Sequence, residues 1–581
     1  MPGKAVPKQD KKFTAVVYFH GMGSQKRYEE VSRLVDALDH YDFKRFKSVE
    51  NKKLVGIEAF PERPLSNLTR DIGFIEVKYR SIIDTFRSIK EFRFYEAYWA
   101  NLTAGGNPPQ EVLWWLLKQT LVPIKALVTP WRGMARLRRS ILLENWDDLT
   151  KKRNDLTKND LKHLIKSYED FEGPEARRKY PRGSGRQFRN SLGENRQDPN
   201  QIERLAWAAR QWWVIYARTN LLYLLVILSF LLAVGLILYI LFITIKAALP
   251  ATAEIIPPGL LSLIGEDSLE PSYANIMILI SALFSTVGVY NFLKEYMGDV
   301  YFWCTYEETA EKHQRRRAIL DHCAESLKHV LLHKDCERVV IVAHSLGTTI
   351  AFDTILELSR TNRAIGIAAK DKIDLGKIQH FITLASPIDK VHYFFENQTS
   401  QYHRYNRVVE QIRGDLASYP FSKSGAPLIH WMNFWDKADI ISGSLQTPAT
   451  ASYPSLKVDN CEAKSFLFPF PDKAHSAYFD DKEVIEKIYQ SVFENMYNFP
   501  KMREEEGQRV KYSKAFIGET GHGAVSTRIF QVLTISLPWV GLTKILAGPE
   551  WNFVNPILIS LIGLTLLGVV IGQIRGHVNR L

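Results

Sequence analysis

The stretch that most constrains the fold is a β-branched run that leads directly into a helical pattern. Residues 339–343, VVIVA, have the composition of a strand that is buried on both faces, as in a parallel sheet covered by helices. After Gly347 the residues TTIAFDTILELSR have helical spacing. Ser345 therefore falls at a turn between strand and helix, and an α/β architecture is expected around it.

The residues around this serine form a recognisable motif. Ala343 and Gly347 are small, which allows a sharp turn at Ser345. The pattern A-H-S-L-G resembles the nucleophile elbow of the α/β-hydrolase superfamily, with Ala in place of the first Gly of G-x-S-x-G. The resemblance implies an α/β-hydrolase fold, which is a mostly parallel sheet with helices on both faces, and a nucleophilic Ser345.

The resemblance also implies two amide donors for an oxyanion hole. The first is the N–H of Leu346, at the start of the expected helix. The second is the N–H of Met22, because the expected strand at residues 14–19 leads into an H-G-x-G turn similar to that of many lipases. The motif residues expected to support the site, by shaping or lining it, are His20, Gly21, Gly23, His344 and Gly347.

In this superfamily the remaining triad members follow the serine in the order acid, then histidine. The expected strand within residues 428–445 ends near two carboxylates, Asp436 and Asp439. The family pattern favours Asp439 within KADIISG, and Asp436 stays the alternative acid. The family's H-x-x-Y pattern fits His475 and Tyr478.

These residues imply a serine hydrolase that cleaves carboxylic esters of lipids through an acyl-enzyme. The chemistry requires no metal and no organic cofactor. Two alternatives stay open, a thioesterase or protein deacylase, and a non-catalytic membrane scaffold that retains a hydrolase fold.

Long apolar runs predict membrane segments. A helix needs about 20 apolar residues to cross a bilayer, and the flanking Lys and Arg residues place the soluble parts in the cytoplasm. We therefore expect a multi-pass protein of the bacterial inner membrane with a cytoplasmic catalytic domain. In the second pair Pro538 and Lys544 leave open a helix that only lies in the interface. The four runs are Leu221–Ile245, Ala274–Leu293, Ile529–Leu546 and Phe553–Ile574.

The formal net charge of +12 predicts an anionic partner. No nucleic-acid-binding motif accompanies the basic residues 172–203, so membrane lipids are the expected partner and nucleic acid is not. Residues 111–140 mix Trp and Leu with Lys and Arg, which fits either a helix on a membrane surface or one packed on the core.

The four cysteines lack metal-ligand spacing. The sequence leaves open whether the chain forms a homo-oligomer.

Together these patterns divide the chain into five parts, two of which form the hydrolase domain. The second part is an amphipathic and basic insertion, and the third and fifth are membrane hairpins. The hydrolase halves are 1–105 and 295–505, the insertion is 106–210, and the hairpins are 211–294 and 506–581.

Overall fold

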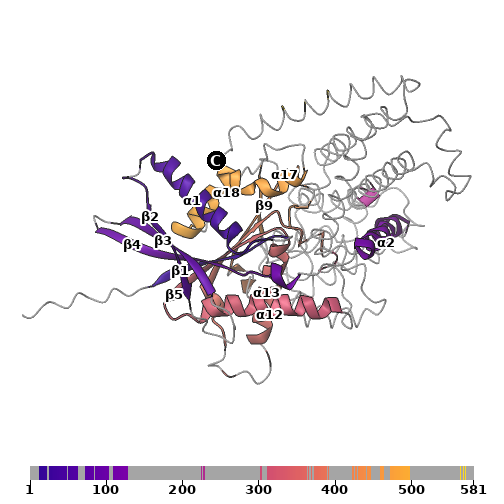
Figure 1. Cartoon of the computed structure of the whole chain (residues 1–581), viewed down its shortest axis with the longest axis horizontal. Helices are drawn as coiled ribbons and strands as arrows, with labels where there is room; N and C mark the ends of the chain where they lie inside the picture. Colours follow the sequence, from indigo (N-terminus) through magenta and orange to yellow (C-terminus); the bar gives the residue numbers. More distant parts are fainter. Residues whose placement is uncertain are drawn as a thin grey trace, which may run out of the picture.

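A computed structural model of the chain gives the architecture (Figure 1). It describes the ranges that follow, together with a few shorter pieces: 12–22, 25–48, 50–62, 72–83, 86–103, 109–128, 311–362, 372–388, 390–391, 429–439, 441–445, 458–463 and 471–496.

The described residues form an eight-stranded mixed sheet in the order β10-β9-β6-β5-β1-β4-β3-β2. The strands from β10 to β4 run parallel to one another, and β3 and β2 continue the sheet in antiparallel fashion. A separate short pair, β7 (Ser422–Lys423) and β8 (Ala426–Pro427), is antiparallel. The strands of the large sheet are β1 (Phe13–Phe19), β2 (Leu54–Glu62), β3 (Ile72–Ile83), β4 (Phe86–Glu96), β5 (Cys336–His344), β6 (Ile378–Leu384), β9 (His430–Trp435) and β10 (Val458–Glu462).

Helices cover both faces of the parallel part of the sheet. Helices α1 (Glu29–Phe46) and α18 (Lys482–Phe493) lie above it in Figure 1, and α12 (Glu311–Leu332) and α13 (Leu346–Asn362) lie below it. The side chains of β1 alternate between the two layers, because successive residues of a strand point to opposite faces. Val16 and Tyr18 join the cluster of α1 and α18. Ala15, Val17 and Phe19 join the cluster of α12 and α13.

Helix α18, the last described helix of this domain, is capped at both ends. The side chain of Asp481 accepts hydrogen bonds from the amides of Glu483 and Val484, which satisfies donors of the first turn. At the other end Arg338 of β5 donates to the carbonyl oxygens of Ser491 (2.8 Å) and Val492. The helix is thereby attached to the centre of the sheet.

Shorter helices lie near the ends of the strands. A 3-10 turn η1 (Ala100–Leu102) follows β4, and another, η6 (Leu375–Lys377), precedes β6. Helix α17 (Pro471–Ser476) leads into the 3-10 turn η7 (Ala477–Asp480) just before α18. Helix α2 (Pro109–Val128) buries one side in the same cluster as α12 and α13.

The predicted membrane hairpins need correction. No helix in the part of the chain that the structure describes combines the length and the apolar character that crossing a bilayer requires. The most apolar described helix, α2, contains Lys118 and Pro123 and packs partly on the protein. The transmembrane part of the predicted fold class is therefore wrong, and so is the multi-pass inner-membrane location. Apart from isolated positions, segments 211–294 and 506–581 lie outside the described residues.

Candidate active site

Ser345 occupies a strained turn between β5 and α13. Its φ of 52° is in the left-handed region, which costs a residue other than glycine about 1–2 kcal/mol. The turn is held because the Ser345 amide donates to Leu384 O of β6 at 2.9 Å, and Thr348 Oγ1 donates to Ser345 O at 2.7 Å. The elbow predicted from the sequence thus has the backbone form that exposes a side chain at the end of a strand.

Gly347 permits the close approach of α13 to the end of β1. A Cβ atom there would lie 2.6 Å from the carbonyl oxygen of Phe19 and nearer still to that of His20. Both obstacles are backbone atoms, so they cannot turn aside as a side chain could. Only glycine fits this position of the predicted motif.

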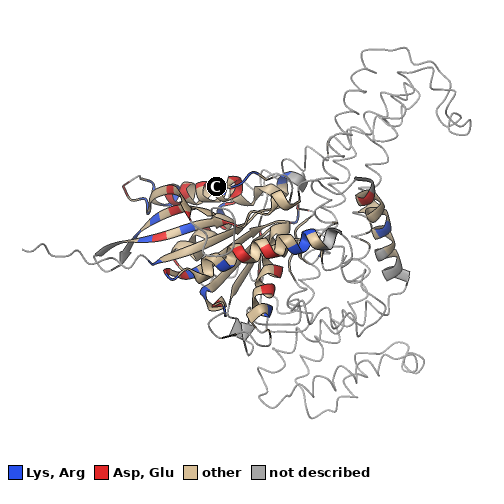
Figure 2. Cartoon of the chain, turned by 60° about the horizontal axis from the view of Figure 1, so that its bottom comes forward, with Lys and Arg blue, Asp and Glu red and all other residues tan. Residues whose placement is uncertain are grey.

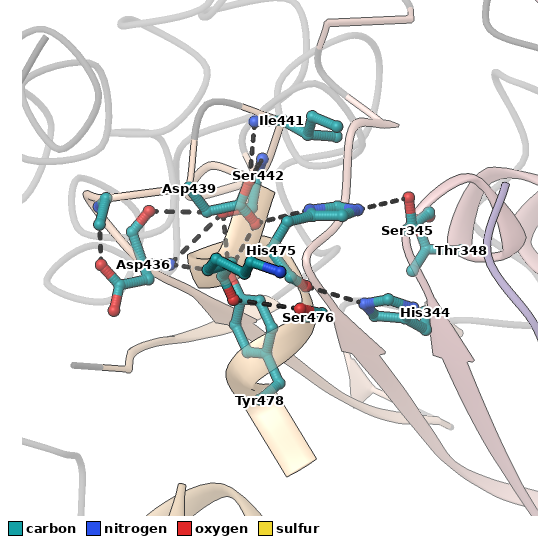
Figure 3. Close-up of polar contacts among 12 residues, drawn as sticks. His344, Ser345, Thr348, Asp436, Asp439, Ile441, Ser442, His475, Ser476 and Tyr478 are labelled. Atoms are coloured by element: carbon teal, nitrogen blue, oxygen red, sulfur yellow. Dashed lines mark hydrogen bonds and ion pairs between the residues drawn. The ribbon is translucent and has the colours of Figure 1, made fainter. Parts of the chain in front are cut away.

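The structure brings Ser345, His475 and Asp439 together in a chain of hydrogen bonds (Figure 3). His475 Nε2 lies 2.8 Å from Ser345 Oγ, and its Nδ1 lies 2.9 Å from Asp439 Oδ2. An ionised carboxylate can only accept, so Nδ1 carries the proton and Nε2 is free to accept the serine proton. This arrangement can activate a hydroxyl as a nucleophile.

Asp439 is fully buried and its oxygens are saturated with donors. Oδ1 accepts from the amides of Ile441 (2.8 Å) and Ser442 (3.2 Å), and Oδ2 also accepts from Tyr478 Oη at 2.9 Å. Burial alone would raise the pKa of Asp439, but His475, the Ile441 amide and Lys390 outweigh it and hold the pKa well below its usual range. Burial, Asp439 and Asp436 raise the pKa of Tyr478 well above its usual value, so this phenol remains a donor.

The alternative acid, Asp436, has a different set of contacts. Its Oδ1 accepts from the amide of Ala438 at 2.7 Å, which closes the turn after β9. Its own amide donates to Tyr478 Oη at 3.0 Å. Of the two acids that the sequence leaves open, the structure therefore places Asp439 against the imidazole and Asp436 in the turn beside it.

The expected oxyanion donors lie around the same turn. Leu346 is the first residue of α13, and the first amides of a helix have no acceptor within it. A Cβ built on Gly21 would lie 3.1 Å from Ser345 Cβ, so the H-G-x-G loop runs directly beside the serine. Met22 is buried in the same hydrophobic cluster as Leu346. Gly23 lies outside the described residues.

His20 holds this loop as a neutral imidazole. Its Nδ1 donates to Gly21 O at 2.9 Å, and its Nε2 accepts from the amides of Trp99 (3.0 Å) and Ala100 (3.3 Å). The ring also stacks on Trp99 with the centroids 4.7 Å apart. Burial lowers the pKa of His20 to about 4.

The sequence patterns did not point to three residues that the fold brings to the site. Glu30 on α1 lies 3.7 Å from His344, which directly precedes the serine. Ser442 Oγ lies 2.9 Å from Tyr478 Oη. Lys390 donates to the carbonyl oxygens of residues 441 and 442 and so secures the acid loop. Glu30 and Lys390 reach the site through the tertiary fold, so no spacing rule connects them to it, whereas Ser442 lies in the same loop as Asp439.

The described residues contain no cluster of three or more His, Cys, Asp and Glu arranged to hold a metal ion. The site is assembled from segments far apart in the chain, from His20 to His475.

Comparison of the chain with family models, with curated proteins and with solved structures gives no match.

Proposed function

We propose that the protein is a serine hydrolase that cleaves carboxylic esters through an acyl-enzyme. The observation that carries the proposal is the chain of contacts from Ser345 Oγ through His475 to Asp439, at a strained turn that opens a helix. A serine whose only role was structural would not need an imidazole at 2.8 Å with a buried carboxylate behind it.

The reaction follows from the direction of these hydrogen bonds. His475 Nε2 takes the proton of Ser345 Oγ while the oxygen attacks the ester carbonyl carbon. The amides of Met22 and Leu346 are the proposed donors to the resulting oxyanion. His475 then gives the proton to the departing alcohol, and a water molecule attacks the acyl-enzyme by the same route. Asp439 stays ionised throughout and stabilises the imidazolium.

A lipid ester is the proposed substrate class because of the surface of α2. Trp114, Leu117, Leu121 and Ile124 form an exposed apolar stripe along this helix, and Trp114 is 66% exposed. Among the described side chains of α2, the charged ones are Glu111 and Lys118 (Figure 2). Its buried side, which includes Trp115, belongs to the same cluster as Met22. An exposed apolar stripe, on a helix whose other side packs in the cluster that contains Met22, suits a substrate with long acyl chains that is taken from a lipid surface.

The test is covalent labelling with a fluorophosphonate, followed by location of the labelled residue by mass spectrometry. We expect the label on Ser345, and we expect Ser345→Ala to lose both labelling and hydrolysis of nitrophenyl esters. Ser326→Ala, a change of the same kind on α12, is the matched control and should behave like the unmodified protein. Absence of label on Ser345 in folded protein would rule the hydrolase out and leave a scaffold.

The substrate class has its own test. Hydrolysis of short-chain and long-chain esters should be compared in the presence and absence of lipid vesicles, with the unmodified protein and a Trp114→Gln/Leu121→Gln variant. We expect the variant to lose hydrolysis of long-chain esters in vesicles while it keeps short-chain hydrolysis in solution. Equal losses of activity on short-chain and long-chain esters would contradict the lipid substrate class but not the hydrolase function.

A further inference from the structure

His344 joins the strand that carries the nucleophile to the segment that carries the general base. Its Nε2 lies 3.1 Å from the carbonyl oxygen of His475, and the two imidazole rings lie 5.2 Å apart between centroids (Figure 3). A carbonyl oxygen only accepts, so Nε2 must carry a proton. This contact fixes the backbone of His475 directly, at the residue whose side chain faces Ser345.

The other nitrogen of the same ring faces a carboxylate. His344 Nδ1 lies 3.7 Å from Glu30 Oε1, which is ion-pair distance, and both side chains are nearly buried. Nδ1 is buried and makes no hydrogen bond to the described residues, so the charged group that a proton on Nδ1 faces is Glu30. Only the imidazolium form provides both the hydrogen bond to the His475 carbonyl and an ion pair with Glu30.

Glu30 extends the connection to the oxyanion loop. Its Oε2 accepts from Tyr18 Oη at 2.8 Å and from the amide of Gly21 at 3.4 Å. One carboxylate therefore contacts β1, the H-G-x-G loop and the last residue of β5. Through His344 the same connection reaches His475.

The charge states agree with this geometry. Burial opposes protonation of His344, but Glu30, the His475 carbonyl and Asp439 outweigh it and raise the pKa. Burial opposes ionisation of Glu30, but His344 and Tyr18 outweigh it and lower the pKa to about 2. Other polar groups also face the pair. They are His20 after β1, Glu96 at the end of β4, and Tyr478 of η7.

We propose that protonated His344 and ionised Glu30 are a positioning pair that holds the backbone of His475, and with it the general base, in line with Ser345. The proposal rests on the serine hydrolase function given above. It adds a second buried charge pair behind the triad, which couples the nucleophile elbow, the oxyanion loop and the general base.

The His344–Glu30 pair makes kcat/KM depend on pH in a distinctive way. When the pH rises through the raised pKa of His344 and the ring loses a proton, the neutral ring has a single N–H and can serve either Glu30 or the His475 carbonyl. The hold on His475 then weakens and kcat/KM falls. In Glu30→Gln the amide group can donate to Nδ1, so the neutral ring keeps its proton on Nε2 and the alkaline fall disappears.

The experiment measures kcat/KM and the rate of Ser345 phosphonylation across pH in purified full-length protein. Glu29→Gln, an exposed change in the same turn of α1, is the matched control and should keep the alkaline fall of the unmodified protein. A second pair of variants tests the donor. His344→Gln retains an N–H and should lose about tenfold, whereas His344→Leu should lose about a hundredfold, the cost of displacing a reacting group by about 1 Å.

The outcomes separate the two proposals. If Ser345 in the unmodified protein does not react with the phosphonate, the hydrolase function itself fails. If Ser345 reacts but Glu30→Gln keeps the same alkaline fall as Glu29→Gln, only the positioning pair is overturned. Equal values of kcat/KM for His344→Leu and His344→Gln would also overturn the positioning pair. If thermal melting shows that His344→Leu is unfolded, the pH profile of Glu30→Gln decides.

Discussion

Two neighbouring strands, β5 and β6, are each followed by a residue with a left-handed backbone, yet only one of these residues is the proposed nucleophile. Ser345 follows β5 with φ 52°, and Ala385 follows β6 with φ 55°. The amide of each residue donates to the next strand, to Leu384 O at 2.9 Å and to Phe434 O at 3.0 Å respectively. Both residues are buried. The sheet thus repeats one strained turn at adjacent positions.

The difference between the two elbows lies in what surrounds them. Ser345 Oγ is 2.8 Å from His475 Nε2, whereas the Ala385 methyl group lies in the hydrophobic cluster with Leu384 and Phe434. A strained turn at the end of a parallel strand therefore does not make a site by itself. It places a side chain at the end of the strand, and the chemistry depends on the groups that the later segments bring to it.

The largest effect is expected when the side chains of the two turns are exchanged. Ser345→Ala should lower kcat by roughly 10⁴–10⁶, as loss of a triad nucleophile does elsewhere. Ala385→Ser in that background should not restore activity, because the imidazole is directed at the first elbow. The measurement is the rate of ester hydrolysis by the single and the double variant, and melting curves check that both are folded. Recovery of activity in the double variant would show that the elbows are interchangeable.

The second prediction concerns the acid that orients the imidazole. Asp439→Asn should lower kcat by about 10⁴, because an amide in place of the carboxylate favours the wrong tautomer of His475. Asp436→Asn keeps an oxygen that can accept from the Ala438 amide, so its loss should stay below about tenfold. Both variants should be assayed on a short-chain ester. An inactive Asp436→Asn beside an active Asp439→Asn would reverse the assignment.

A third prediction concerns Glu96, a buried carboxyl group at the end of β4. Glu96 accepts the Tyr28 amide at 2.5 Å, but its Oε1 is buried and has no hydrogen-bond partner in the part of the chain described. Burial raises the pKa of Glu96 to about 7. Glu96 ionises in the unfolded chain from about pH 4 but resists ionisation in the folded protein, so stability falls as pH rises from about 4 to 7.

Glu96→Gln cannot ionise and should remove that penalty. We expect the variant to be more stable than the unmodified protein by up to about 3 kcal/mol at pH 8, and to show little difference at pH 4. Denaturant unfolding at the two pH values measures the difference. A gain of the same size at both pH values would mean that packing, not ionisation, is responsible.

The smallest expected effect compares glycine and alanine at the nucleophile position. Ser345→Gly relieves the left-handed strain that Ser345→Ala keeps, so the glycine variant should be more stable by about 1 kcal/mol. Both variants should be inactive, which removes catalysis from the comparison. An alanine variant as stable as the glycine variant would indicate that the turn stores no strain.

The centre of the parallel sheet could be predicted from the sequence because β5 carries a short β-branched run that is buried on both faces. The run at 339–343 lies within β5, and the predicted helix after Gly347 lies within α13. The antiparallel strands β2 and β3 were not predicted, since several apolar residues of β2 are exposed at the edge of the sheet. β10, with the sequence VDNCE, lacks any apolar alternation. Its place is determined by pairing with β9.

The site was predictable only where a local motif carries it. Ser345, Gly347 and His20 belong to short patterns whose backbone shape follows from neighbouring residues. Glu30 has no such pattern, because its contact with His344 depends on how α1 packs against the sheet. The membrane prediction is corrected on a separate ground, since no helix in the described part of the chain combines the length and the apolar character that crossing a bilayer requires.

The distance along the chain between the parts of the site has a consequence for synthesis. A ribosome makes the H-G-x-G loop first, the serine much later, and His475 last of the proposed triad. Helix α18, which follows His475, must also dock on α1, where Tyr489 Oη donates to Asp42 at 2.6 Å. A chain that ends before His475 therefore has the proposed nucleophile without its proposed base, so the proposed activity can arise only after the segment that carries His475 has been made and has folded.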